Sequence, residues 1–386
     1  MKKGLLAFIL SLVCGIFSST LFLFGVFESL ELKMLDFRFR QFAKPEQSSK
    51  NVVLAAIDEQ SLQHFKKNGI PWKWPRDFYA TLVRYLNRGG AKVIVFDIFF
   101  SDPDIDRANT DAEETDGAFS KAIVEAGNVI LASNLMHYDY LLGGDNQLIC
   151  KEDIIITPPD AKFLFPNYPA AILPIPLFQQ DKTSIGAANY YVDSEDGVCR
   201  HVFPFYVFND VVIPQIGVSA FLKTSYSKKV EIISNNLYKI GDVSIPIDNK
   251  GRFLINWYGK GGPDGCFRYY SIGALIVSAA NEEINKPPIV ASSEFKDKIV
   301  IIGSNAAGLF DLVNTPFSIY KPFPAMEIHA TILSNLLQHD FLVRASPTIS
   351  LIVILLFSFA VCFSFYFFTK VRYIVLILQF LLLDGS

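Results

Sequence analysis

The sequence predicts an α/β fold with a mainly parallel sheet, flanking helices and a β-rich insert, anchored by transmembrane helices. Two long apolar segments enclose the more polar body of the chain. Within that body, nearly unbroken apolar runs alternate with helical stripes, a pattern that is typical of buried parallel strands and their crossover helices. From Tyr140 to about Gly265, short β-rich runs are broken by Pro and Gly, which predicts an antiparallel elaboration of the sheet.

The first apolar segment, residues 4–27, is long enough to cross a hydrocarbon core of roughly 30 Å at about 1.5 Å per residue. It exceeds the apolar core of a signal peptide, and no small-x-small cleavage site follows it, so we expect a retained anchor. Two lysines precede the segment and two glutamates follow it, which places the N-terminus in the cytoplasm. Residues 30–345 are therefore expected to form an extracytoplasmic domain.

The second span, residues 347–368, is followed by Lys370 and Arg372, which return the chain to the cytoplasm. Arg344 on the other side weakens this bias without reversing it. Residues 373–386 begin a third apolar run that is about half as long as a crossing requires, as expected for a truncated transmembrane helix. The chain is thus predicted to be a multi-pass membrane protein with a large extracytoplasmic domain.

The body begins with a helix and a strand–helix–strand unit. Leu32, Leu35 and Phe39 stand at helical spacing, so we expect the first span to continue as one helix into the domain. Residues 51–58 and 91–100 are predicted strands, and residues 76–87 carry an apolar helical stripe that Gly89 and Gly90 end. The later expected elements are a helix at 118–126, strands at 129–133 and 298–303, and a helix at 326–338.

Charge and cysteine usage exclude two classes of function. The formal net charge is −3 and no basic cluster is present, so nucleic-acid binding is not expected. Two of the five cysteines fall inside the spans, which leaves Cys150, Cys199 and Cys266 outside. An oxidising compartment would permit one bridge among these three, with the pairing left open. The absence of C-x-x-C removes support for a zinc or redox motif.

Asp58 and Asp97 follow the first two predicted strands, so both carboxylates are expected at the carboxyl edge of neighbouring parallel strands. Open α/β sheets bind ligands in the crevice at this edge. The structural alternative is that either aspartate accepts backbone N–H groups of the following turn, or pairs with Arg76. We favour the structural alternative for each residue alone and regard the pair together as the best ligand-binding candidate.

Trp74 and Arg76 belong to a dense segment, Pro71-Trp-Lys-Trp-Pro-Arg-Asp77. The two tryptophan rings each need apolar cover and an N–H partner, and a rigid lid over a ligand is one use of them. Arg76 would either clamp an anionic group or neutralise the two aspartates. We favour neutralisation, because buried carboxylates without a cation are costly.

Other patterns argue against metals, nucleotides and nucleophilic catalysis. The acidic loop from Asp102 to Asp116, expected to be mobile, has Arg107 where a calcium loop needs Gly. Residues 303–308 lack the glycine and lysine pattern of a phosphate loop. Glu327 and His329 stand two apart on a predicted helix and would point in different directions, so a surface or core histidine is favoured over a metal site. We predict no catalytic residue, metal or cofactor.

An ordered series of motifs resembles one known family. The segments 53–62, Trp72-x-Trp74-Pro75-Arg76 and 90–100 are followed by 258–265, 298–303, 311–316 and 327–330. In this order they resemble the CHASE2 extracellular sensor domain of bacterial membrane receptors, from about Leu30 to Arg344. The resemblance adds Asp311, in the segment 311–316, to the ligand-binding candidates.

The resemblance implies a sensor in the bacterial inner membrane, between spans that lead to a cytoplasmic cyclase, histidine kinase or related output domain, which these residues lack. We expect an extracytoplasmic ligand whose identity stays open, a membrane partner and a homodimer. The alternatives are a membrane-tethered envelope enzyme with an acidic site at Asp58 and Asp97, or a scaffold for envelope partners.

Overall fold

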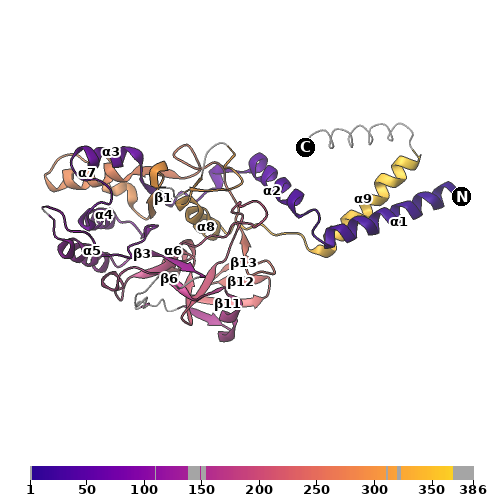
Figure 1. Ribbon diagram of the computed structural model, residues 1–386, viewed down its shortest axis with the longest axis horizontal. Coiled ribbons are helices and arrows are strands. Elements are labelled where there is room, and N and C mark those ends of the chain that lie inside the picture. The colour runs from indigo at the N-terminus through magenta and orange to yellow at the C-terminus, as the bar shows by residue number, and fades with distance from the viewer. Residues whose placement is uncertain are drawn as a thin grey trace. The chain divides into compact units, whose positions relative to one another are not determined.

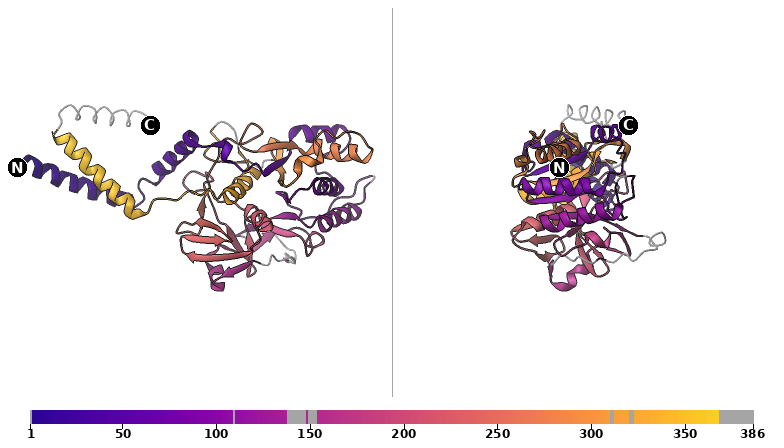
Figure 2. Two further views of the ribbon diagram at one scale, coloured as in Figure 1. Left: turned by 180° about the vertical axis from the view of Figure 1, so that it is seen from behind. Right: turned by 90° about the vertical axis from the view of Figure 1, so that its left-hand side faces the viewer.

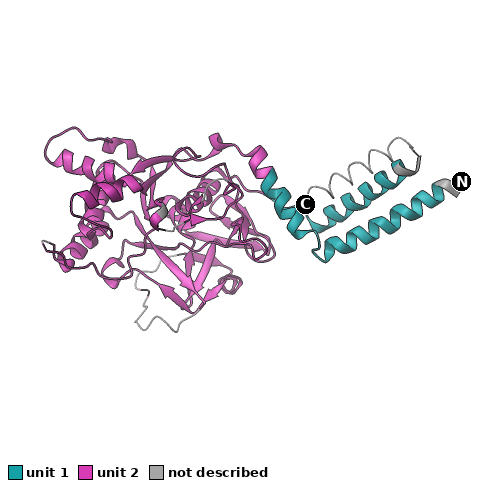
Figure 3. Ribbon diagram, turned by 45° about the horizontal axis from the view of Figure 1, so that its top comes forward, with its two compact units in different colours: residues 1–37, 343–386 teal, residues 38–342 magenta. Residues whose placement is uncertain are grey.

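The fold is described from a computed structural model that covers residues 2–108, 110–137, 148, 154–309, 312–319 and 323–367. The chain divides into two compact units (Figure 3). Unit 1 comprises Met1–Phe37 and Val343–Ser386, and unit 2 comprises Arg38–Leu342.

Unit 1 contains helix α1 (Lys2–Leu23), most of α2 (Glu28–Phe42) and α9 (Pro347–Phe367). Helices α1 and α9 pack against each other, and a Cβ atom added to Gly15 would lie 2.8 Å from Leu355 Cδ2. Gly4–Leu23 and Pro347–Ser364 are long and apolar enough to cross a membrane, judged by length and composition.

The prediction that the first span continues unbroken into the domain is wrong. Residues 24–27 form turns between α1 and α2, and Gly25 has a φ of 70°, in the left-handed region. A glycine adopts this conformation without steric cost, so it ends α1 and lets the chain restart as α2. The helix predicted around Leu32, Leu35 and Phe39 is present, and Leu32 and Phe39 are buried.

The central sheet of unit 2 has the strand order β15-β1-β16-β2-β3, and both β6 and β7 pair with β3 (Figure 1). Its pairings are parallel except for β3 with β6, which is antiparallel. The strands are buried almost throughout, which explains their unbroken apolar sequences. Their bounds are β1 Val52–Ile57, β2 Val93–Phe96, β3 Val129–Met136, β6 Ala170–Ile172, β7 Ser184–Ala187, β15 Arg268–Ser271 and β16 Ile299–Ser304.

Helices cover both faces of this sheet. One apolar core joins alternate strand residues such as Ile302 to four helices, α3 (Glu59–Lys67), α4 (Arg76–Arg88), α5 (Ala112–Ala126) and α7 (Ile272–Glu283). The next residue, Gly303, faces the other way, where a Cβ atom would lie 2.8 Å from Met326 Cβ. Helix α8 (Met326–Gln338) therefore lies on the opposite face, packed against α6 (Ile216–Thr224).

The β-rich insert contributes three small sheets, ordered β13-β12-β11-β4, β10-β9-β5 and β14-β8. Both views in Figure 2 place the strands around β11 apart from α3 and α7. Most pairs are antiparallel, but β4 with β11 and β5 with β9 are parallel. The bounds are β4 Ile155–Thr157, β5 Asn167–Tyr168, β8 His201–Val202, β9 Phe205–Phe208, β10 Val211–Pro214, β11 Lys229–Ser234, β12 Leu237–Ile240, β13 Val243–Pro246 and β14 Phe253–Leu254.

The remaining described elements are short. They are strands β17 Leu312–Val313 and β18 Phe323–Pro324, and 3-10 turns at Pro45–Gln47, Pro159–Leu164, Pro176–Phe178, Ser292–Phe295 and Ala307–Leu309. The mixed α/β class is confirmed, as are the four predicted sheet strands and the helices beginning near Arg76 and Met326.

A buried ion-pair network stabilises the insert. Arg200 is fully buried and its guanidinium lies 2.8 Å from Asp193 Oδ2 and 2.7 Å from Asp196 Oδ2. The hydrogen bond from Arg200 holds the pKa of Asp196 below its usual range. Asp193 also faces Arg252 at 3.9 Å. These charges are matched within the insert and form part of its packing.

Candidate functional site

The predicted site lies where the central strands end. Asp58 follows β1 and Asp97 follows β2, but β16 lies between these two strands. The prediction that β1 and β2 are neighbours is therefore wrong. The strand that separates them comes from residues 299–304, so sequence proximity could not reveal it. Within the described residues no hydrogen bond links the two carboxylates.

Asp58 is the N-cap of α3. Its Oδ1 accepts from the Ser61 backbone N–H at 2.8 Å and from the hydroxyl groups of Ser61 and Ser271. The Ser61 hydroxyl in turn accepts from the Gly273 N–H at 2.9 Å. One aspartate thus joins β1, α3 and the start of α7, as an N-cap residue does when it satisfies a free helix N–H. The structural alternative given for Asp58 is the arrangement found here.

Asp97 belongs to a buried polar chain on the other face of the sheet. His329 Nε2 of α8 lies 3.4 Å from Asp97 Oδ1, and His329 Nδ1 lies 2.7 Å from Gln215 Nε2. Gln215 Oε1 accepts from the Gly217 N–H, so the amide NH₂ of Gln215 donates to Nδ1. A neutral His329 then carries its proton on Nε2, toward Asp97. His329 and Gln215 are almost completely buried.

The hydrogen-bonded side chains Asp97, His329 and Gln215 are suited to fixing one another's positions rather than to acid–base catalysis. Both ring nitrogens of His329 already have partners, so neither is free to activate a nucleophile. Asp97 Oδ2 is buried and accepts no hydrogen bond from the described residues. An acceptor of this kind favours an incoming hydrogen-bond donor. Among the described residues, Asp97 Oδ2 is therefore an unsatisfied buried acceptor at this edge of the sheet.

Trp74 is part of the core. It is fully buried, and its ring packs edge-on against Phe65 at 4.9 Å and Trp72 at 5.1 Å between centroids. Its indole N–H has no acceptor among the described side chains and backbone groups. The aromatic cluster fixes α3 and α4 together. The hypothesis of a lid over a ligand finds no geometric support at Trp74.

Arg76 pairs with the acidic loop. Its Nε lies 3.6 Å from Asp116 Oδ1, its backbone N–H donates to Asp104 at 2.9 Å, and its guanidinium lies over the Phe100 ring. The favoured interpretation, in which Arg76 neutralises Asp58 and Asp97, is therefore wrong. The carboxylates near the start of α4 come from Asp104 of the loop and Asp116 of α5, which the hydrogen bond from the Asp104 N–H to Asp116 brings together.

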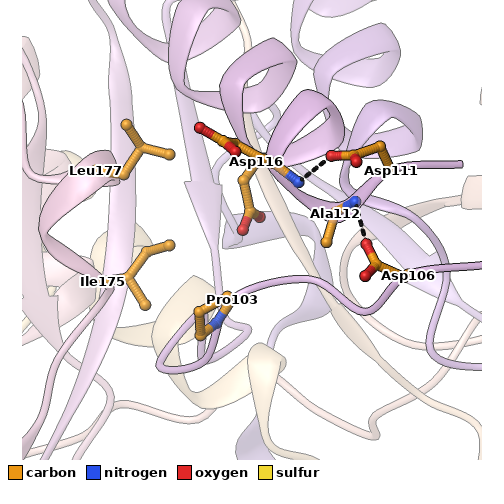
Figure 4. Close-up of a pocket in the computed structure, with 8 residues that line it drawn as sticks. Pro103, Asp106, Asp111, Ala112, Asp116, Ile175 and Leu177 are labelled. Atoms are coloured by element: carbon orange, nitrogen blue, oxygen red, sulfur yellow. Dashed lines mark hydrogen bonds between the residues drawn. The ribbon is translucent and has the colours of Figure 1, made fainter.

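The acidic loop borders a cavity of about 440 Å³ (Figure 4). Asp116 points into the space between Pro103 and Ile175, while Asp106 and Asp111 bond to the backbone at the start of α5. These carboxylates therefore act first as helix caps. No group of three or more metal-binding side chains occurs in the described ranges, so the calcium pattern is not reproduced there. Residues 112–116 belong to helix α5 and not to the predicted loop.

Glu327 is a buried acid that the sequence did not single out as a site residue. Its Oε1 accepts from the Gly262 N–H and from the Tyr269 hydroxyl, and its side chain is fully buried. Burial raises the pKa of Glu327 to about 7. Glu327 and His329 point to different partners, as predicted for residues two apart on a helix. The available signal was that Glu327 is the one acidic residue of the predicted helix 326–338.

The remaining candidates have limited structural information. Asp311 and Cys150 lie outside the described residues. Cys199 and Cys266 are free thiols, and burial raises the pKa of Cys266 to about 12. Neither is therefore a reactive thiolate at neutral pH.

Comparison with known proteins identifies the family. The model of the CHASE2 domain matches residues 8–363, from within α1 to within α9. No curated protein and no solved structure matches the chain. CHASE2 domains are sensor domains and not catalytic ones.

Proposed function

The chain belongs to the CHASE2 domain family, and we propose that it is the extracytoplasmic input module of a bacterial membrane signalling receptor. A stimulus outside the cytoplasm would act on unit 2 and be transmitted through the membrane helices to a cytoplasmic output domain, such as a nucleotide cyclase or a kinase. The observation that carries the proposal is the family match, which spans the α/β unit and most of both apolar helices.

The membrane arrangement follows from the two helices of unit 1. Helices α1 and α9 both contain a segment that is apolar and long enough to cross a bilayer. Lys2 and Lys3 precede the apolar segment of α1, and Lys370 and Arg372 follow α9, so both of these ends would be cytoplasmic. The chain between them would then leave and re-enter the membrane once, with residues 38–342 outside.

Stimulus detection is assigned to the carboxyl edge of the sheet. Asp97 contacts α8 through His329, and α8 ends only eight residues before α9 begins, across 339–346. A donor ligand that binds Asp97 Oδ2 in one of two positions of α8 would bias that helix, which is the requirement for a ligand-driven switch. Asp58, in contrast, is already committed to capping α3.

We also propose that the module acts as a homodimer. Leu32 and Phe39 of α2 are buried within the chain and are not available to a second copy. Leu30, Met34 and Phe37 are exposed at helical spacing on the same helix. They offer the apolar stripe that a juxtamembrane helix pair would use.

Cysteine labelling in intact cells tests the sidedness. Asn235 is exposed in the turn between β11 and β12, so Asn235→Cys should react with a membrane-impermeant maleimide, in a chain whose native cysteines are replaced by serine. The matched control, Lys3→Cys before the first span, should react only after the cells are permeabilised. Labelling of position 3 but not of position 235 in intact cells would overturn the receptor proposal.

A hybrid receptor tests the site. The chain joined to an adenylate cyclase catalytic domain should produce cyclic AMP in membranes, and Asp97→Asn should change that output. Glu231→Gln, a charge removal on the insert, serves as the matched control and should leave the output unchanged. Equal output from all three proteins would remove Asp97 from the signalling path.

A further inference from the structure

Two adjacent tyrosines of β15 contact two very different glutamates. Tyr270 donates to Glu294 at 3.2 Å, and Glu294 is 41% exposed and pairs with Arg268 at 3.0 Å. Tyr269, on the other face of the strand, donates to Glu327. Glu327 is fully buried and forms no ion pair within the described part of the chain. A tyrosine hydroxyl therefore donates in one case to Glu294, which is partly exposed and has an ion-pair partner, and in the other to Glu327, which is buried and has no ion-pair partner among the described residues.

Glu327 joins three elements through a single oxygen. It lies in the first turn of α8, and its Oε1 accepts from Tyr269 of β15 and from the N–H of Gly262 in the loop 259–265. Its Oε2 is buried and has no hydrogen-bond partner among the described residues. A carboxyl group with one idle buried oxygen is better satisfied when that oxygen carries a proton than when it carries charge.

The loop 259–265 lies directly on this carboxyl group. A Cβ atom at Gly261 would be 2.8 Å from the Phe323 ring and 3.1 Å from Glu327 Oε1, so only glycine permits the approach. Gly265 is equally constrained, since its Cβ would lie 2.2 Å from the Lys260 carbonyl oxygen. The closed loop keeps solvent from Glu327, whose charged form would then have no cation beside it among the described residues.

The other titratable groups around Glu327 do not neutralise it. Tyr269 and the Cys266 thiol face it from β15 and from the end of the loop, and both are neutral at pH 7 because burial raises their pKa values. His329 on α8 is directed to Asp97 and Gln215, and Arg268 is paired with Glu294. Protonation is therefore the remaining way to remove the charge.

We propose that Glu327 is a proton-operated latch: when neutral it holds the loop 259–265 against α8 and β15, and when it loses its proton the loop opens to water. The titration falls near neutrality, because burial raises the pKa of the acid to about 7 while the two hydrogen bonds partly oppose this effect. The latch sits at the start of α8, the helix that precedes α9 in the chain. The role of the latch in signalling rests on the proposed function. The opening of the loop 259–265 does not depend on that proposal.

Hydrogen exchange of the full chain in lipid nanodiscs tests the latch. Between about pH 5 and about pH 9, protection of residues 259–265, corrected for the intrinsic pH dependence of exchange, should fall by at least about tenfold. In Glu327→Gln the protection should stay high and constant, since the amide keeps both hydrogen bonds and cannot ionise. Glu294→Gln, the exposed counterpart, should behave like the unmodified protein.

Infrared spectroscopy gives an independent readout. The carbonyl stretch of a protonated carboxylic acid should disappear with rising pH, and Tyr269→Phe should move this transition to higher pH because it removes a donor that favours the carboxylate. If Glu327→Gln fails to fold, the infrared measurement on Tyr269→Phe still tests the proposal. Protection that does not change with pH, or an infrared transition that Tyr269→Phe leaves in place, would overturn the proposal. Neither result would bear on the sidedness measured by cysteine labelling.

Discussion

Glu327→Gln is expected to change how the stability of the protein depends on pH. The folded protein holds the Glu327 proton up to a pKa of about 7, whereas the ordinary value is 4.5. Between these two pH values the folded state binds a proton that the unfolded state has lost. The contribution of Glu327 to stability is therefore fully present below about pH 4.5 and is lost as pH rises through about 7.

The magnitude follows from the width of this interval. At about 1.4 kcal/mol per pH unit, an interval from 4.5 to about 7 corresponds to about 3 kcal/mol of unfolding free energy. Glu327→Gln removes the titration and keeps an acceptor for Gly262 and Tyr269. The stability of the variant relative to the unmodified protein should therefore rise by about 3 kcal/mol between acidic pH and pH above 7.

Urea unfolding at a series of pH values measures this difference. Trp257 is a suitable fluorescence probe, because it is buried and its ring packs against Phe323. Phe323 in turn lies beside Gly261 of the loop 259–265. Glu294→Gln provides the matched control and should show a constant difference from the unmodified protein across the range. A constant difference for Glu327→Gln as well would refute the reasoning, since the buried acid would then have no shifted proton equilibrium.

Three further changes have distinct expected outcomes. Asp58→Ala should lower the unfolding free energy by about 1 kcal/mol in urea titrations, because it removes the N-cap of α3. Arg200→Met should lower it by about 3 kcal/mol, because two aspartates lose their buried cation. Gly15→Leu should reduce the yield of an oxidative Cys14–Cys362 cross-link several-fold, because a side chain at position 15 meets α9 where the two thiols lie side by side.

Each of these expectations has its own control. Asp58→Asn retains a capping oxygen and should cost less than the alanine variant; equal losses would argue against capping. A loss below about 1 kcal/mol in Arg200→Met would mean that the network contributes little to the insert. Gly4→Leu faces open space and should leave the cross-link unchanged, so an equal effect of both glycine variants would contradict the packing of α1 on α9.

Local sequence patterns predicted most of the elements of the central sheet. The run at 52–57 is buried at every position, and the helix from Arg76 to Arg88 ends at Gly89 and Gly90 as its sequence indicates. Such features depend on residues that are close in the chain. The helix α6 was missed inside the β-rich insert, because its mostly apolar, fully packed sequence lacks a polar face to give it a helical period.

The site was predicted less well, because it depends on pairings between distant residues. The sequence placed Asp58 and Asp97 at strand ends, but the insertion of β16 separated them and gave them different partners. Asp97 meets His329, which is 232 positions later, and Arg76 meets Asp116 instead of either aspartate. The sequence indicated Glu327 only as a possible metal ligand beside His329. Its contacts with Tyr269 and the loop 259–265 could not be predicted, because both are far from it in the chain.

The family, the mixed α/β class, the two apolar helices, four strands of the central sheet and several of its flanking helices could be predicted from the sequence, because hydrophobic period, helix-ending glycines and ordered motifs are local properties. Only the packing of the folded chain shows which strand lies between β1 and β2, that Arg76 pairs with Asp116, and that Glu327 has no cation beside it among the described residues. The physical reason is that the energy of a buried charge is set by the groups packed around it, and packing brings these groups together from separate parts of the chain.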